Sequence, residues 1–133
     1  MKKLSFLLLA VPALFITGCN NDDDDTKKAI GLQGDWKLVS IDHPMVGEKI
    51  VFNDGDVTWK FNEGKTKLTV IKTTATTETL DSGSYNYSLG PVEEACDQSL
   101  TVADTNYGCI TIGDSTLIVS SAYVDGNIYT FIR

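Results

Sequence analysis

This 133-residue sequence contains only one histidine, the residue type that most often serves as a catalytic base or a metal ligand. His43 is the single histidine and precedes Pro44, so we expect it to be an exposed turn residue and not a catalytic base. The sequence has no Gly-x-Ser-x-Gly elbow, phosphate-binding loop, dinucleotide fingerprint or His-Glu-x-x-His motif. We therefore expect no enzymatic activity, no metal site and no cofactor.

Basic residues and long hydrophobic runs are also scarce. Eleven lysines and arginines stand against 18 acidic residues, which gives a net charge of −7 at pH 7. This balance argues against nucleic acid and anionic lipid head groups as partners, because both attract basic surfaces. The one long apolar run, residues 4–16, is too short to span a bilayer. Any attachment to a membrane therefore needs a means other than a transmembrane helix.

The N-terminal segment has the layout of a secretory signal peptide. Lys2 and Lys3 precede the apolar run, and the residues Ile-Thr-Gly-Cys at positions 16–19 close it. This ending resembles a bacterial lipobox, which implies that Cys19 is acylated on sulfur and becomes the mature N-terminus. The alternative is an ordinary secreted protein in which Cys19 has no such role. Removal of residues 1–18, the expected signal peptide, leaves 115 residues with a net charge of −9.

Residues 19–31 are expected to form a tether that starts with the acylated cysteine. They show no apolar periodicity, and residues 22–25 are four consecutive aspartates. An acidic run directly behind the lipid cysteine resembles the signal that sends Bacteroidota lipoproteins to the cell surface. That resemblance implies an outer-membrane lipoprotein exposed on the cell. The alternative is a simple spacer between membrane and domain.

Two further cysteines, Cys96 and Cys109, lie in the body of the sequence. An exported chain meets an oxidising compartment, where an even number of remaining cysteines indicates a disulfide. Closing a loop of this size contributes about 3 kcal/mol in the chain-entropy description. The alternative is a pair of free, buried thiols.

From residue 32 onward the pattern is typical of strands separated by tight turns. The clearest case is residues 57–61, where Val57, Trp59 and Phe61 alternate with polar residues. The threonine-rich residues 73–79 favour a half-exposed strand, and residues 91–96 favour a single helical turn after Pro91. Other expected strands cover residues 67–70, 84–89, 99–103, 107–112, 116–121 and 127–133. About eight to ten short strands predict an all-β fold, either an antiparallel up-and-down barrel or a sandwich.

The first expected strand opens with Gly34-Asp35-Trp36, and the last ends with Arg133. Gly-x-Trp at this place resembles the lipocalin signature, and the stretch through residue 40 is similar to small lipocalin-like lipoproteins of Bacteroidota. The resemblance implies a lipocalin-like (calycin) β-barrel over residues 32–133. It further implies that Trp36 closes the barrel floor with Arg133 packed across its ring, a contact worth roughly 0.5–2 kcal/mol. The alternative is that Trp36 is simply a core aromatic residue.

Two functions compete at this point. In the first, the lipid-anchored barrel binds a small apolar ligand through Trp59, Phe61, Tyr85 and Tyr87, which share the apolar face of neighbouring strands. In the second, the same side chains form a filled core. The protein then acts as a protein-binding module, an inhibitor or adhesion factor, through loops such as residues 91–97. The volume and lining of any interior cavity distinguish the two.

Overall fold

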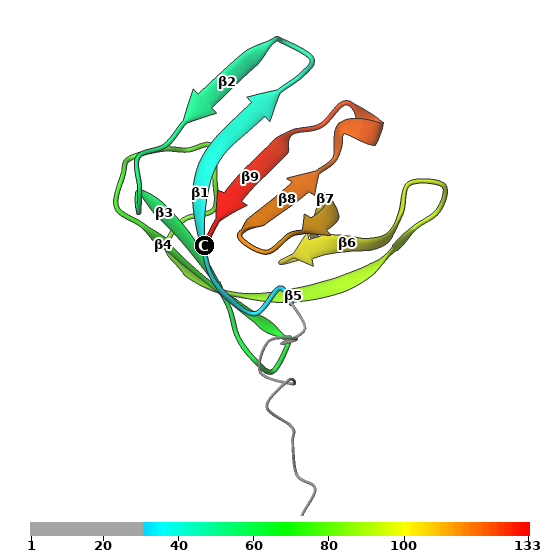
Figure 1. Cartoon of the computed structure of the whole chain (residues 1–133), viewed down its shortest axis with the longest axis horizontal. Helices are drawn as coiled ribbons and strands as arrows, with labels where there is room; N and C mark the ends of the chain where they lie inside the picture. The colour runs from blue at the N-terminus through cyan, green and yellow to red at the C-terminus, as the bar shows by residue number, and fades with distance from the viewer. Residues whose placement is uncertain (1–30) are drawn as a thin grey trace, which may run out of the picture.

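The computed structural model describes residues 31–133, which fold into an all-β domain (Figure 1). The predicted signal peptide, Cys19 and the aspartates at 22–25 lie outside these residues. Within the described range no helix has the length and apolarity that crossing a bilayer demands. The described elements are β1 (Gly34–His43), β2 (Glu48–Val51), β3 (Val57–Phe61), β4 (Lys67–Lys72), β5 (Gly83–Val92), β6 (Cys96–Val102), β7 (Thr105–Ile112), β8 (Thr116–Ser120), the short 3-10 helix η2 (Ala122–Val124) and β9 (Ile128–Ile132).

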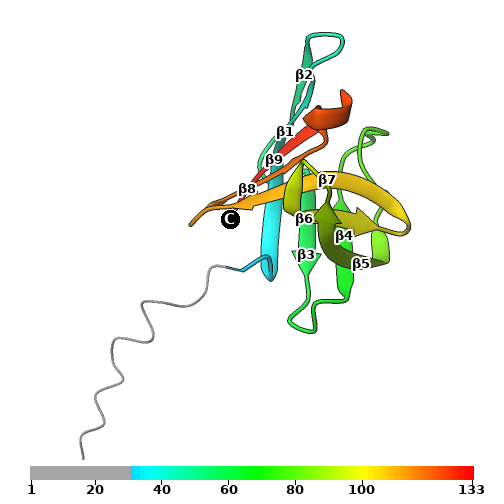
Figure 2. The same cartoon turned by 90° about the vertical axis from the view of Figure 1, so that its right-hand side faces the viewer.

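Eight of these strands close into an antiparallel barrel, which confirms the predicted fold. The order is β1-β3-β4-β5-β6-β7-β8-β9, and β9 pairs back onto β1. β2 stands outside the ring and pairs with the upper half of β1, at residues 40–43, while β3 pairs with the lower half, at residues 34–37 (Figure 2). All neighbouring strands are antiparallel, and within residues 31–133 the short β2 is the one strand that has a neighbour on a single side.

Alternation along the strands directs the large apolar side chains to the inside of the barrel. In β3, Val57, Trp59 and Phe61 are buried while Lys60 is exposed, as the sequence pattern predicts. The β1–β9 register shifts between Leu38 and Ser40, which marks a bulge or irregularity in the pairing. The core contains Trp36, Leu38, Ile41, Leu68, Val70, Leu100, Val102, Leu117, Val119, Tyr129 and Phe131 in addition to the β3 residues.

Two local predictions are wrong. Residues 73–79 form a loop and not a strand, because they lack alternating apolar residues and β3, the partner of β4, begins only at Val57. Residues 91–96 do not form a helical turn, since β5 runs on through Val92 and the chain reverses over residues 93–95. Glu94 adopts a left-handed φ of 62° in that reversal, which a helical turn does not allow.

The predicted disulfide is confirmed. Cys96 at the start of β6 is bonded to Cys109 in β7, with their Cα atoms 5.9 Å apart. In the strand register Cys109 faces Ser99 and Cys96 faces Val92, so the bond connects residues that are not direct cross-strand partners. The disulfide therefore ties the β5–β6 hairpin to β7 near the tip of that hairpin.

Candidate functional site

The centre of the barrel is filled by aromatic side chains. The ring centroid of Trp59 lies 4.9 Å from that of Phe131, 5.6 Å from that of Tyr107 and 6.3 Å from that of Tyr129. An eight-stranded barrel is only wide enough for side chains or one small ligand, and large aromatic residues on short strands occupy that width. The space that an apolar ligand would need is therefore taken by the protein.

The four residues predicted to bind a ligand all come together, but three of them belong to this packed interior. Trp59, Phe61 and Tyr87 are buried, and the Phe61 and Tyr87 rings meet edge to face at 5.0 Å. Burial raises the pKa of Tyr87, and the Gln33 side chain partly offsets this effect. Tyr85 is partly exposed and packs against the edge of this core, and its hydroxyl donates to the carbonyl oxygen of Asp81 at 2.7 Å.

Trp36 and Arg133 close one end of the barrel, here called the floor. The Trp36 ring is fully buried and its Nε1 donates to the Leu32 carbonyl at 2.7 Å. The Arg133 guanidinium carbon lies 4.2 Å from the Trp36 ring centroid, so the contact expected from the sequence is present. Its Nη1 also donates to the carbonyls of Gly31 and Gln33. Gly34 fits here because its φ of +119° strains any residue with a side chain.

The opposite end, here called the loop end, carries residues 44–47, 73–82 and 121–127. His43 links these three segments: its Nδ1 lies 2.7 Å from Asn127 Oδ1 and its Nε2 lies 3.5 Å from Glu78 Oε2. The expectation that His43 is an exposed turn residue is wrong, since it ends β1 and its side chain is only 18% exposed. The interactions at both ring nitrogens hold the loops in one arrangement.

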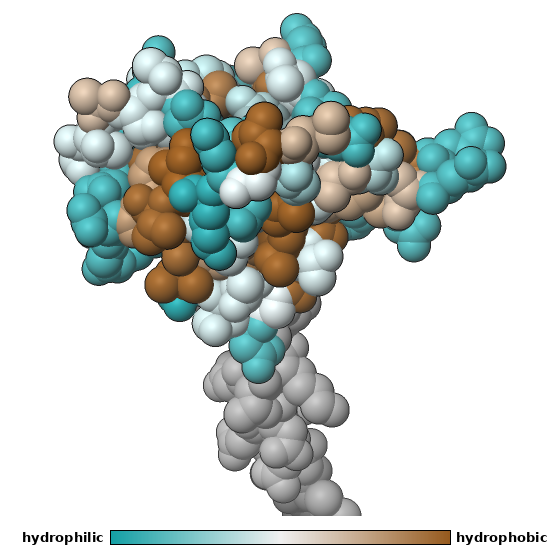
Figure 3. Space-filling view, turned by 90° about the horizontal axis from the view of Figure 1, so that it is seen from above, coloured by the Kyte–Doolittle hydropathy of each residue, from teal (hydrophilic) through white to brown (hydrophobic). Residues whose placement is uncertain are grey.

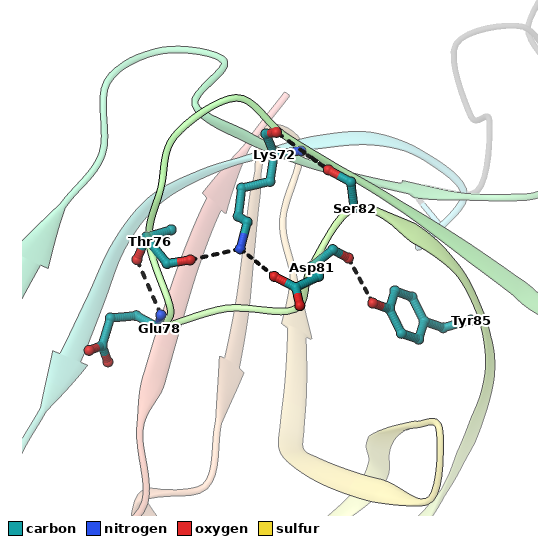
Figure 4. A network of polar contacts seen from close by, with 6 residues as sticks. All are labelled: Lys72, Thr76, Glu78, Asp81, Ser82 and Tyr85. Carbon is teal, nitrogen blue, oxygen red and sulfur yellow. Dashed lines mark hydrogen bonds and ion pairs between the residues drawn. The ribbon is translucent and has the colours of Figure 1, made fainter.

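A polar network around Lys72 fixes the 73–82 loop (Figure 4). Lys72 Nζ donates to Asp81 Oδ1 at 2.6 Å and to the Thr76 carbonyl at 2.7 Å, and the Lys72 amide donates to Ser82 Oγ. The hydrogen bond and the charge of Lys72 lower the pKa of Asp81. The middle and the C-terminal end of the loop are therefore tied to the last residue of β4, which explains why an irregular threonine-rich segment keeps a defined course.

The loop end also exposes apolar side chains. Met45 and Val46 in the β1–β2 turn are 69% and 68% exposed, and Val124 in η2 is 65% exposed beside the half-exposed Tyr123. Seen from above, this end shows hydrophobic patches divided by a hydrophilic strip (Figure 3). Sequence reasoning did not identify these residues, although Met-Val between Pro44 and Gly47 was a signal, since turns rarely carry two large apolar residues.

The loop singled out from the sequence, residues 91–97, is exposed but acidic. Glu93, Glu94 and Asp97 all face solvent at the tip of the β5–β6 hairpin, beside an open surface pocket of about 480 Å³. Carboxylates that face water are stable as they stand and indicate no partner. The exposed apolar side chains of the loop end lie instead on residues 45–46 and 123–124, and further exposed apolar residues, Val51, Ile71, Leu89 and Ile132, are carried by strands.

A smaller open pocket of about 300 Å³ lies on the outside of the barrel wall near the loop end. Tyr107 and Tyr129 line it, together with residues of β7 and of the 121–127 segment. Burial, with the nearby Tyr129 and Tyr85 hydroxyls, raises the pKa of Tyr107 to about 12. Sequence reasoning missed this pocket, because it arises from where two strands separate and not from a motif.

Comparison with protein-family models, with curated proteins and with solved structures finds no match for this chain.

Proposed function

We propose that this protein is a lipid-anchored, non-enzymatic binding module that recognises another protein through the loop end of a filled barrel. The observation that carries this proposal is the exposure of apolar side chains on two ordered loops at the end away from the floor. The proposal selects the second of the two functions that the sequence left open.

The filled interior speaks against transport of a small apolar molecule. Trp59 has four aromatic neighbours with ring centroids within 6.3 Å, counting Phe61, and none of these rings can leave without exposing apolar surface. Opening a cavity for even a small ligand costs about 2–5 kcal/mol for each large core side chain displaced. The free energy gained from binding the ligand would have to exceed this cost.

The apolar loop residues have the composition of an interface centre. Methionine and tyrosine are enriched in the buried centres of protein interfaces, where charged residues are depleted. Met45 and Tyr123 are of these types, and Val46 and Val124 extend the apolar surface beside them. Because His43 bonds Asn127, the two loops that carry these residues are held before a partner arrives, which lowers the entropy cost of binding.

Anchoring through Cys19 fits this orientation. The described chain begins at the floor, where Gly31 accepts a hydrogen bond from Arg133, so the predicted tether would attach at the end opposite the apolar loops. A lipid on Cys19 and an export signal at residues 22–25 would then place the domain on the outer membrane with its loop end directed outward. The partner would meet the loops and not the tether.

Site-specific photo-crosslinking in intact cells tests the proposal. A photoreactive residue at Val46 and another at Val124 should each join the same protein, while one at Glu63, exposed in the β3–β4 turn of the floor, should not. The double variant Met45→Ser, Val124→Ser should weaken the isolated complex at least tenfold and leave the unfolding midpoint unchanged. A small apolar molecule that copurifies at one per chain and resists removal would instead establish a carrier.

A further inference from the structure

The barrel wall opens where β7 and β8 separate. β8 pairs with β7 from Cys109 to Ile112 and ends at Ser120, so residues 105–108 of β7 have no β8 partner in the described chain. Gly108 stands at the point of separation with φ +122°, and a Cβ there would overlap the Ser120 carbonyl. The two backbones are therefore in tight contact below the opening, while above it the chain turns away into η2.

The pocket of about 300 Å³ lies outside this opening, and its inner wall is aromatic. The Tyr107 and Tyr129 rings meet at 5.7 Å and 62°, and Trp59 supports both from behind at 5.6 Å and 6.3 Å. Because these rings are fixed by the core, they present a rigid apolar surface to whatever enters.

The rim of the pocket supplies neutral hydrogen-bonding groups. Asn127 Oδ1 is engaged by His43, which leaves the Asn127 NH₂ group as a donor. Thr105 adds a hydroxyl group to the lining, while the Ser121 hydroxyl already donates to the Asn127 carbonyl. Tyr107 adds a phenol group, which is protonated at physiological pH as in any tyrosine and can donate a hydrogen bond.

We propose that this pocket binds a single neutral sugar ring. None of the residues that line it is charged, so a charged ligand would lose its hydration without gaining a counter-charge. A purely apolar ligand would leave the hydroxyl and amide groups without partners. A pyranose has an apolar face that fits the tyrosine rings and hydroxyls along its edge, and the volume suits one ring, near the lower limit of about 300 Å³ for ligand pockets.

This inference goes beyond the proposed function and does not rest on it. The two sites adjoin, because Ser121, Gly126 and Asn127 line the pocket while Tyr123 and Val124 of the same segment belong to the proposed protein interface. The variants that test sugar binding are therefore placed on β7, which carries no residue of that interface.

An NMR titration of the full chain in detergent tests the inference. The probes are the methyl pyranosides of glucose, galactose and mannose, and N-acetylglucosamine, with glucuronate and glucosamine as charged counterparts. We expect at least one neutral probe to shift the amide signals of Thr105, Tyr107 and Asn127, and the charged counterparts to bind more weakly. Tyr107→Phe, which removes only the hydroxyl, should weaken the best probe about fivefold, the effect of losing one hydrogen bond.

Two further variants complete the test. Thr105→Trp places a bulky side chain at the exposed mouth of the pocket and should abolish binding, while Thr66→Trp, at an exposed position in the β3–β4 turn outside the lining, should leave binding unchanged. If Thr105→Trp fails to fold, Tyr107→Phe decides the question. The inference is overturned if no neutral probe shifts these signals, if a charged probe binds most tightly, or if Tyr107→Phe binds as well as the unmodified chain.

Discussion

The two tryptophans show how differently one residue type can be used within a single core. Both rings are fully buried, but Trp36 Nε1 donates to the Leu32 carbonyl, whereas Trp59 Nε1 has no partner among residues 31–133. An unsatisfied buried donor costs about 1–3 kcal/mol. Trp59 offsets that cost through its aromatic neighbours, while Trp36 joins the first strand to the C-terminus.

A double-mutant cycle measures the contact at the floor. Trp36→Ala should cost about 3–5 kcal/mol, the usual penalty for removing a large core side chain. Arg133→Ala should cost less, about 0.5–2 kcal/mol, because it removes the cation–π contact and exposed hydrogen bonds to Gly31 and Gln33 that water can replace. The double variant should be less destabilised than the sum, since the two side chains touch. Urea unfolding provides the free energies, and strict additivity would show that the contact contributes nothing.

The phenol of Tyr107 predicts an alkaline loss of stability. Its pKa rises from 10.0 to about 12 in the folded state, so the folded chain holds the phenolic proton more tightly than the unfolded chain. This contribution to the free energy of unfolding is complete below pH 10.0 and is lost as the pH rises toward about 12. Urea unfolding across this interval should show a shallower decline for Tyr107→Phe than for the unmodified chain. Tyr123→Phe is the control, and an unchanged decline in Tyr107→Phe would contradict the prediction.

At the scale of strands and loops, the sequence predicted the strands that alternate apolar and polar residues. It did not predict the structures that depend on contacts between segments distant along the chain. The bounds of β3 were predicted correctly from the alternation of Val57, Trp59 and Phe61 with polar residues, because one buried face is enough to define a strand. Residues 73–79 have strand-like composition, yet the Lys72 contacts with Asp81 and Thr76 fold them into a loop, and the sequence shows no sign of those contacts. The pocket beside Tyr107 could not be predicted either. It exists because β8 ends at Ser120, opposite Cys109, and leaves residues 105–108 of β7 without a β8 partner.

The separation of β7 from β8 depends on Gly108. A Cβ at this residue would overlap the Ser120 carbonyl, and the φ of +122° is unfavourable for any other residue. We expect Gly108→Ala to cost at least about 2 kcal/mol in the free energy of unfolding. Gly90→Ala is the matched control, because Gly90 lies in β5 with no atom within 4 Å of its added Cβ. Equal effects from the two variants would mean that the close approach at Ser120 is unimportant.

The disulfide stabilises the β5–β6 hairpin against β7. Cys96 and Cys109 are separated by 13 residues, and a loop of that size corresponds to about 3 kcal/mol of chain entropy. The double variant Cys96→Ser, Cys109→Ser should lose about this amount in urea unfolding. The unmodified chain should lose a similar amount in reductant, and the double variant should then be insensitive to reductant. A double variant as stable as the oxidised chain would contradict the entropic account.

At the scale of the whole molecule, the barrel has two distinct ends. Both described termini meet at the floor, where Arg133 bonds the Gly31 carbonyl, while the apolar loops lie at the other end. This arrangement suits a protein that is anchored at the floor and binds a partner at the loop end. The prediction to test first at this scale is therefore the lipid anchor.

Lipid on Cys19 is the expected anchor. Mass spectrometry of the mature protein should find acyl chains on Cys19 and no residues before it, and Cys19→Ala should leave an unprocessed or unanchored product. In intact cells, added protease should remove the domain, and replacing the four aspartates at 22–25 with asparagine should protect it. Normal anchoring of the Cys19→Ala chain would refute lipidation, and complete protection before any replacement would leave the acidic run as a spacer.

The pairing of β1 also determines how the domain responds to force. A pull on the chain ahead of residue 31 runs along β1, which is bonded to β3 at residues 34–37 and to β9 at residues 37–42. Hydrogen bonds between antiparallel strands lie across such a pull, so they must shear together and cannot peel apart singly. Arg133 reinforces the point where the load enters by binding the Gly31 and Gln33 carbonyls. A domain suspended by this strand would keep its barrel closed under the drag of flowing liquid.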